Sequence, residues 1–257
     1  MLIDSHCHVH DDEVFNLDRE ATLERARAAG VGQIICIGTT AVDSRQAIDF
    51  ASSHSQVFAT VGLHPHDSKL GDDELAQLEE LVNSPRVVAV GECGLDYYYE
   101  NSPRARQQLA LRHQINLALD HDLPVVFHVR DAFGDFFKIV DEYQSGSRIR
   151  GVVHSFSTGP DELKGVLARG FYVGLNGIMT FAKDTHQLAA AKSVPLDRLL
   201  LETDSPFLTP VPFRGKINEP AYVRQIAEFL ASLRGESVAQ LAKSTTTNAQ
   251  KLFNIAL

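Results

Sequence analysis

Short apolar runs alternate along this chain with longer stretches whose apolar positions recur at helical spacing. Helical spacing predicts, among others, a helix from Leu17 to Ala29 that ends at Gly30 and another from Arg104 to His121. The short runs are rich in β-branched residues and predict strands. The predicted strands are Leu2–His6, Gln33–Gly38, Val57–Leu63, Val87–Glu92, Pro124–His128, Gly151–His154, Phe171–Leu175 and Arg198–Glu202.

This alternation predicts an α/β protein. Eight strand–helix units in 257 residues match the size of a (β/α)8 TIM barrel. An open doubly wound sheet is the alternative, but no GxGxxG sequence follows the first strand. No linker or low-complexity segment interrupts the pattern, so we predict one domain over residues 1–257. The segment from Pro220 to Leu257 predicts two helices separated near Gly235, with the run from Ser244 to Asn248 as capping residues.

The charge balance and the cysteines narrow the possible partners and location. The chain carries 24 Lys and Arg against 33 Asp and Glu, a net charge of −9. This argues against sequence-independent binding along duplex DNA, which needs many cationic side chains. It allows a small anion-binding site where metal ions supply the positive charge. Three cysteines without a CxxC pair, no secretory signal and no membrane-spanning run predict a cytoplasmic protein with no membrane contact.

Histidines and carboxylates stand at the carboxyl ends of the predicted strands. His6 and His8 lie two apart in an extended run and therefore point to one face. Taken singly, each such residue has an ordinary explanation as a hydrogen-bonded core histidine, a helix cap or a turn residue. Because these strand ends form one rim of a barrel, we expect the side chains to gather at one site. The set is His6, His8, Glu92, His128, His154 and Asp204.

The number of donors predicts two divalent metal ions. Six nitrogen and oxygen donors exceed what one tetrahedral ion needs, and a carboxylate such as Glu92 can bridge two ions. Such a pair can activate a water and stabilise the leaving oxygen of a phosphoryl or acyl transfer. Imidazole suits Zn²⁺, Mn²⁺ or Fe, whereas carboxylate and water suit Mg²⁺, so this mixed set does not decide the metal; we expect Mg²⁺, Mn²⁺ or Zn²⁺.

The chain resembles the TatD family of metal-dependent deoxyribonucleases, within the amidohydrolase-like barrels. Ser155 stands where Cys is more usual and Val129 replaces a small polar residue, and neither change removes a donor. The matching segments are Asp4-Ser-His-Cys-His8, Gly62-Leu-His-Pro65, Gly91-Glu-Cys-Gly-Leu-Asp-Tyr-Tyr98, His128-Val-Arg-Asp131, His154-Ser-Phe156, Glu202-Thr-Asp-Ser-Pro206 and Arg214-Gly-Lys-Ile-Asn-Glu-Pro220.

The resemblance implies a (β/α)8 hydrolase whose metal ligands are the six residues named above. It also implies that Asp204 is the general base that takes a proton from the attacking water. Glu92, the carboxylate able to bridge two ions, is the second predicted catalytic residue. A TatD-type enzyme would cleave phosphodiester bonds in DNA.

Substrate contacts are predicted from position. His64 ends the third strand, and Arg130 lies two residues beyond His128, where a guanidinium can hold a phosphate. Arg214 and Asn218 lie in the loop after the last strand, where barrels often bind phosphate. The alternative is that all four are ordinary loop residues. The run Tyr97 to Tyr99 can stack on bases or pack a loop, and we favour packing.

We expect a monomeric exonuclease that trims single-stranded DNA ends, because an acidic chain suits a pocket for a strand end better than a duplex groove. A small-molecule hydrolase acting on an amide, lactone or ester is the alternative. A lysine able to form a bridging carbamate would favour it, but the fourth and fifth strands end in Glu92 and His128. A metal-binding scaffold is a third possibility, although a scaffold needs neither a base nor nearby cations.

Overall fold

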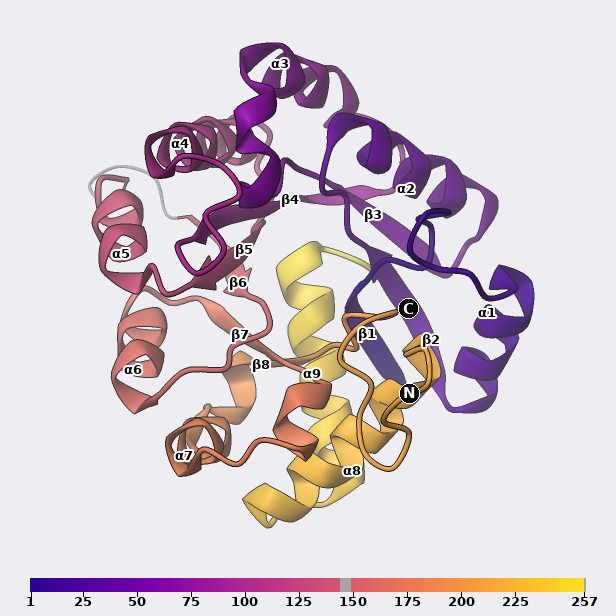
Figure 1. Ribbon diagram of the computed structural model, residues 1–257. Coiled ribbons are helices and arrows are strands. Elements are labelled where there is room, and N and C mark those ends of the chain that lie inside the picture. The colour runs from indigo at the N-terminus through magenta and orange to yellow at the C-terminus, as the bar shows by residue number, and fades with distance from the viewer. Residues whose placement is uncertain (144–148, 257) are drawn as a thin grey trace. The chain divides into compact units, whose positions relative to one another are not determined.

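The computed structural model describes residues 1–143 and 149–256. Its centre is a sheet of eight strands in the order β1 to β8, with helices between them (Figure 1). The strands are β1 Leu2–Cys7, β2 Val31–Cys36, β3 Val57–Val61, β4 Val87–Asp96, β5 Val125–Arg130, β6 Gly151–Val153, β7 Tyr172–Leu175 and β8 Leu199–Leu201. The α-helices are α1 Arg19–Ala28, α2 Ala41–Ser53, α3 Asp72–Leu81, α4 Arg104–Asp120, α5 Phe133–Asp141, α6 Pro160–Ala168, α7 Thr185–Ser193, α8 Val223–Arg234 and α9 Val238–Phe253.

Backbone hydrogen bonds connect the first strand to the segment that follows the last. The Asp204 amide donates to the His6 carbonyl at 2.8 Å, and the His8 amide donates to the Ser205 carbonyl at 2.7 Å. The neighbouring strands whose register is described pair in parallel. A parallel sheet that runs from β1 to β8 and joins its two edges is a (β/α)8 barrel, and this prediction is confirmed.

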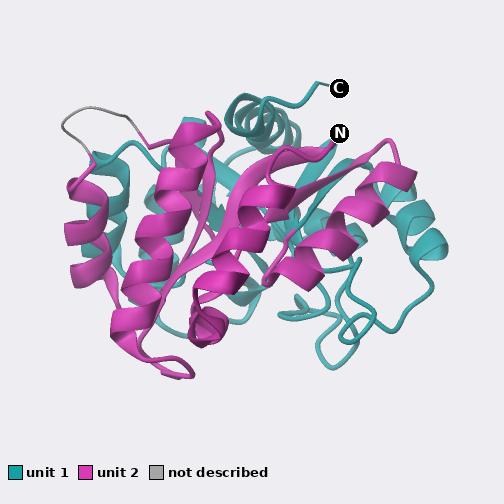
Figure 2. Cartoon of the chain, turned by 90° about the horizontal axis from the view of Figure 1, so that it is seen from above, with its two compact units in different colours: residues 1–36, 155–257 teal, residues 37–154 magenta. Residues whose placement is uncertain are grey.

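The described chain divides into two compact units (Figure 2). Unit 1 contains residues 1–36 and 155–257, and unit 2 contains residues 37–154. The prediction of a single domain stays a prediction. Within unit 1, Cys7 and Cys36 are register partners on β1 and β2 and therefore lie side by side, although they are far apart in sequence. Both are buried free thiols, as is Cys93 of unit 2.

The strands are buried on both faces, which explains their continuous apolar runs. Every residue of β1, β3, β7 and β8 is buried. All eight predicted strands exist, but β4 continues to Asp96 and β5 to Arg130. Glu92 therefore lies inside its strand, beside a register shift between Val90 and Cys93, and does not close it. The pattern missed this extension because Gly94 interrupts the apolar run.

The two C-terminal helices are confirmed, but their predicted caps are wrong. Gly235 ends α8 with φ of 70°, a left-handed conformation that glycine adopts easily. The N-cap of α9 is Ser237, whose hydroxyl accepts from the Gln240 amide at 3.1 Å. The run from Ser244 to Asn248 lies inside α9, where the buried Asn248 amide donates to the carbonyl of Leu196, before β8, and to that of Leu199, the first residue of β8. Tertiary contacts explain these polar residues better than capping does.

Gly94 is required by the close pairing of β4 and β5. Its φ is +154°, and an added Cβ would lie 1.8 Å from the His128 carbonyl oxygen. We expect Gly94→Ala to lower the free energy of unfolding by about 3 kcal/mol or more, because the backbone itself must move. Urea unfolding measures this. The control is Gly134→Ala in α5, where a Cβ meets nothing within 4 Å; equal effects of the two substitutions would contradict the argument.

Within the described residues, no helix combines the length and the apolar character needed to cross a membrane.

Candidate metal centre

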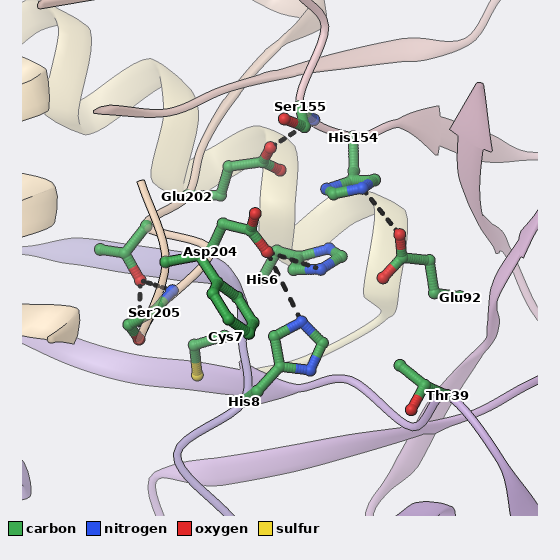
Figure 3. A network of polar contacts seen from close by, with 12 residues as sticks. His6, Cys7, His8, Thr39, Glu92, His154, Ser155, Glu202, Asp204 and Ser205 are labelled. Carbon is green, nitrogen blue, oxygen red and sulfur yellow. Dashed lines mark hydrogen bonds and ion pairs between the residues drawn. The ribbon is translucent and has the colours of Figure 1, made fainter. Parts of the chain in front are cut away.

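In unit 2, three imidazoles surround one buried carboxylate oxygen. Glu92 Oε1 lies 2.8 Å from His154 Nε2, 2.9 Å from His128 Nδ1 and 3.5 Å from His64 Nε2. Glu92 and His128 come from β4 and β5, whereas His154 follows β6 and His64 follows β3. The contact of His154 with Glu92 is drawn in Figure 3. The structure thus brings Glu92, His128 and His154 together as predicted.

The chemistry of this cluster fits a divalent metal ion. The donor atoms of His64, Glu92 and His128 all lie within 4.8 Å of one another. Imidazole and carboxylate are donors that Zn²⁺ and Mn²⁺ accept, and a buried carboxylate needs compensation by positive charge or hydrogen bonds. The cluster therefore supplies a set of groups that a cation would stabilise.

Asp96 is a member of this cluster that the sequence reasoning missed. Its Oδ2 lies 3.1 Å from His128 Nε2 and 3.0 Å from His66 Nε2. His128 consequently contacts a carboxylate with each of its ring nitrogens, Glu92 on one side and Asp96 on the other. Strand alternation offered a signal, because residues 92, 94 and 96 of one extended strand share a face. Ending the strand at residue 92 hid it.

The electrostatics of the cluster separate neutral from charged groups. Burial lowers the pKa of His64 to about 4, against the opposing effect of Glu92. Burial alone would lower the pKa of His128, but hydrogen bonds with Asp96 and Glu92 outweigh it and raise the pKa. Burial would raise the pKa of Asp96, but the hydrogen bond with His128 and the Tyr99 amide hold it well below its usual range. At neutral pH, Asp96 is therefore ionised and His64 neutral.

In unit 1, Asp204 and the two N-terminal histidines form a second cluster (Figure 3). Asp204 Oδ1 lies 3.4 Å from His6 Nε2 and 3.5 Å from His8 Nε2. His6 and His8 point to one side of β1, as alternation predicts, with ring centroids 5.2 Å apart. His6 is fully buried, whereas the Asp204 side chain keeps 14% of its surface exposed. Asp204 is thus the member of this cluster that is most open to solvent.

Buried polar side chains hold the loop that carries Asp204 by hydrogen bonds. Asp4 accepts hydrogen bonds from the Thr203 amide at 2.8 Å and the Thr203 hydroxyl at 2.6 Å. Burial raises the pKa of Asp4 well above its usual value, against these hydrogen bonds. Asn218 is also buried, and its amide donates to the carbonyls of Thr203 and Phe207 at 2.8 and 2.5 Å. Asn218 therefore stabilises the loop from inside. The prediction that it contacts the substrate is wrong, because its side chain is buried.

Glu202 is a second residue that the sequence reasoning passed over. It lies buried directly after β8, and its Oε1 accepts from the Ser155 amide at 2.5 Å (Figure 3). Gly174 leaves room for it, because a Cβ there would lie 2.1 Å from Glu202 Oε2. The cue was its position as another carboxylate at a strand end, close to Asp204.

The two predicted arginines are exposed, whereas the three tyrosines range from half-buried to exposed. Arg214 is exposed, and its guanidinium lies 3.9 Å from the centre of the Phe181 ring. Arg130 is exposed at the end of β5. Tyr97 packs as expected, with its hydroxyl 3.1 Å from Asp135. Tyr98 and Tyr99 are 58% and 54% exposed, so the packing interpretation is wrong for them.

The chain is similar to metal-dependent hydrolases over nearly its whole length. It is 37% identical to the uncharacterized metal-dependent hydrolase YabD of Bacillus subtilis (strain 168), covering 99% of this chain and 100% of that protein. It is 38% identical to the 3'-5' ssDNA/RNA exonuclease TatD of Cronobacter sakazakii, covering 93% of each. The crystal structure of YJJV, a TatD homologue from Escherichia coli K12, superposes with a TM-score of 0.92 at 32% identity, covering 99% of this chain and 98% of that one.

The barrel and its clusters of histidine and carboxylate define a metal-dependent hydrolase. A family model described as TatD related DNase matches residues 3–254. The chain belongs to this TatD family, as its motifs predicted.

Proposed function

We propose that this protein is a deoxyribonuclease that uses two divalent metal ions to trim single-stranded DNA ends. The observation that carries the proposal is the gathering of three imidazoles around Glu92 Oε1, together with a partly exposed Asp204 between His6 and His8. The relative from Cronobacter sakazakii is named a 3'-5' ssDNA/RNA exonuclease, which supports shortening from the 3' end.

The proposed metal ligands come from both clusters and are His6, His8, Glu92, His128, His154 and Asp204. Support comes from the fold, because a (β/α)8 barrel presents the carboxyl ends of all its strands at one rim. The donors fit Mg²⁺, Mn²⁺ or Zn²⁺, and Glu92 is the carboxylate suited to bridge two ions. Bound ions would supply an acidified water and positive charge for the leaving oxygen.

The residues of the chain perform the proton and positioning steps. The water oxygen forms a bond to phosphorus and Asp204 receives one proton of the water. The ester bond to the leaving sugar oxygen breaks, and this oxygen takes up a proton from solvent to leave as a hydroxyl group. Asp4 and Asn218 hold the Asp204 loop in place for this transfer. Exposed Arg130 and Arg214 hold the phosphates of the strand.

His64 acts toward the substrate as a hydrogen-bond donor. Its Nδ1 accepts from the His66 amide at 3.2 Å, which leaves the proton of the neutral ring on Nε2. Because burial keeps the pKa of His64 at about 4, the ring stays neutral over the physiological range. Its Nε2 can therefore donate to Glu92 or to a substrate oxygen without adding a charge.

Cleavage of single-stranded DNA after metal removal tests the proposed activity. Protein stripped with a chelator should leave a 5'-labelled oligonucleotide intact, and adding back Mg²⁺, Mn²⁺ or Zn²⁺ singly should produce a ladder of products shortened from the 3' end. A blunt duplex of the same sequence should be cleaved more slowly, because its ends are paired. Full metal uptake without any shortened product would contradict the proposal and direct the search to small esters, lactones and amides.

A further inference from the structure

Tyr98, Tyr99 and Arg130 form an exposed aromatic and cationic surface, called here the Tyr–Arg surface. More than half of each tyrosine is open to solvent. The Arg130 guanidinium carbon lies 4.2 Å from the Tyr98 ring centre and 4.7 Å from the Tyr99 ring centre. The two rings meet edge to face at 4.8 Å. Two large aromatic rings left exposed beside a cation are a feature of ligand surfaces, since a packing role would bury them.

Hydrogen bonds to the backbone of the three tyrosines fix the position of the Tyr–Arg surface. Asp96 Oδ1 accepts hydrogen bonds from the Tyr98 amide at 3.0 Å and the Tyr99 amide at 2.9 Å. The preceding Tyr97 amide donates to the Arg130 carbonyl at 2.9 Å, which ties the turn after β4 to the end of β5. The rings are therefore positioned before any ligand arrives, which lowers the entropy lost on binding.

The same carboxylate connects the Tyr–Arg surface to the candidate metal centre. Asp96 Oδ2 contacts His66 and His128, while its Oδ1 holds the tyrosine turn. The His66 ring also meets the Tyr99 ring edge to face at 5.5 Å. One side chain thus separates the exposed rings from the imidazoles that surround Glu92. A molecule bound on the rings would therefore lie close to the Glu92 cluster of unit 2.

We propose that the Tyr–Arg surface receives an unpaired nucleobase of a single-stranded substrate, while Arg130 contacts the neighbouring phosphate. The inference rests on the proposed nuclease function and extends it to the recognition step. Stacking on aromatic rings tolerates any base because every base has a π-face, and it excludes paired bases because these are stacked inside a duplex. A local arginine also explains how a chain of net charge −9 binds a polyanion at one place.

Binding of two oligomers of equal charge tests the stacking. The oligomers are fluorescent oligo-dT and an abasic deoxyribose-phosphate chain of the same length. Anisotropy measures their affinity for metal-loaded protein carrying Asp204→Asn, in which cleavage is slow compared with the binding measurement. We expect oligo-dT to bind roughly tenfold more tightly or better. The double substitution Tyr98→Ala with Tyr99→Ala should abolish this preference, and the matching double change to Phe should preserve it.

The arginine has its own control. Arg130→Gln should lower the affinity for both oligomers by a similar factor and reduce the salt dependence of binding. Arg150→Gln should change neither, because this exposed arginine before β6 already pairs with Asp122. If the Asp204→Asn protein with both tyrosines intact binds the two oligomers equally, or binds neither, the Tyr–Arg surface is not a base site, even if wild-type protein cleaves DNA. A preference for oligo-dT in a protein that cleaves nothing would keep it and overturn the nuclease proposal.

Discussion

Replacing Asp204 by Asn should reduce turnover on single-stranded DNA by a factor of about 10² to 10⁴ while at least one metal ion stays bound. The carboxylate is the proposed proton acceptor, and an amide of the same shape accepts no proton from water. Asn also tolerates the left-handed backbone of this position, where φ is 59°, so the loop keeps its conformation. Single-turnover cleavage and metal analysis of the same preparation measure the two effects.

The matched control for this substitution is Asp197→Asn. Asp197 is an exposed carboxylate just before β8, whereas Asp204 follows the other end of the same strand. The control should retain wild-type turnover and metal content. If Asp204→Asn cleaves DNA at the wild-type rate, Asp204 is not the general base.

Glu92→Gln should remove most of the metal affinity and with it the activity. Glu92 Oε1 is the atom around which three imidazoles converge, and an amide carries neither its charge nor its capacity to bridge two ions. Changing groups that only support metal ligands costs about 10-fold to 100-fold in affinity, so losing this carboxylate should cost at least about 100-fold. Titration of stripped protein with Mn²⁺ measures the affinity.

Thermal unfolding gives an independent readout of the same change. Bound metal should raise the melting temperature of the wild type, because a ligand held only by the folded state stabilises it, and this increase should vanish in Glu92→Gln. Glu79→Gln is the control, since Glu79 is also a glutamate beside a histidine, with 3.1 Å between Glu79 and His113, but outside the Glu92 cluster. Equal metal responses of the two variants would exclude Glu92 as a ligand.

The barrel was predictable because its signals are local and repeated. Strands buried on both faces appear as continuous apolar runs, and the helices between them show apolar residues at helical spacing. The gathering of candidate ligands was predictable for a related reason: once strands are parallel, their carboxyl ends share one rim. His6, His8 and Asp204 needed only strand alternation and strand order to be placed together.

The missed features depend on contacts between residues far apart in sequence. Asp96 escaped attention because a glycine-containing strand was ended too early, and its contacts with His66 and His128 come from other elements. Asn218 looked like a polar loop residue available to substrate, but the fold buries it and uses its amide for backbone carbonyls. Exposure of Tyr98 and Tyr99 likewise depends on how the turn after β4 is held, which sequence periodicity does not report.

The most direct test of the metal-dependent mechanism is the cleavage rate of single-stranded DNA as stripped protein is titrated with Mn²⁺. We expect no cleavage in chelator and a rate that rises with added metal and levels off near about two ions per chain. Cleavage that persists in chelator, or saturation with metal that yields no cleavage, would contradict it.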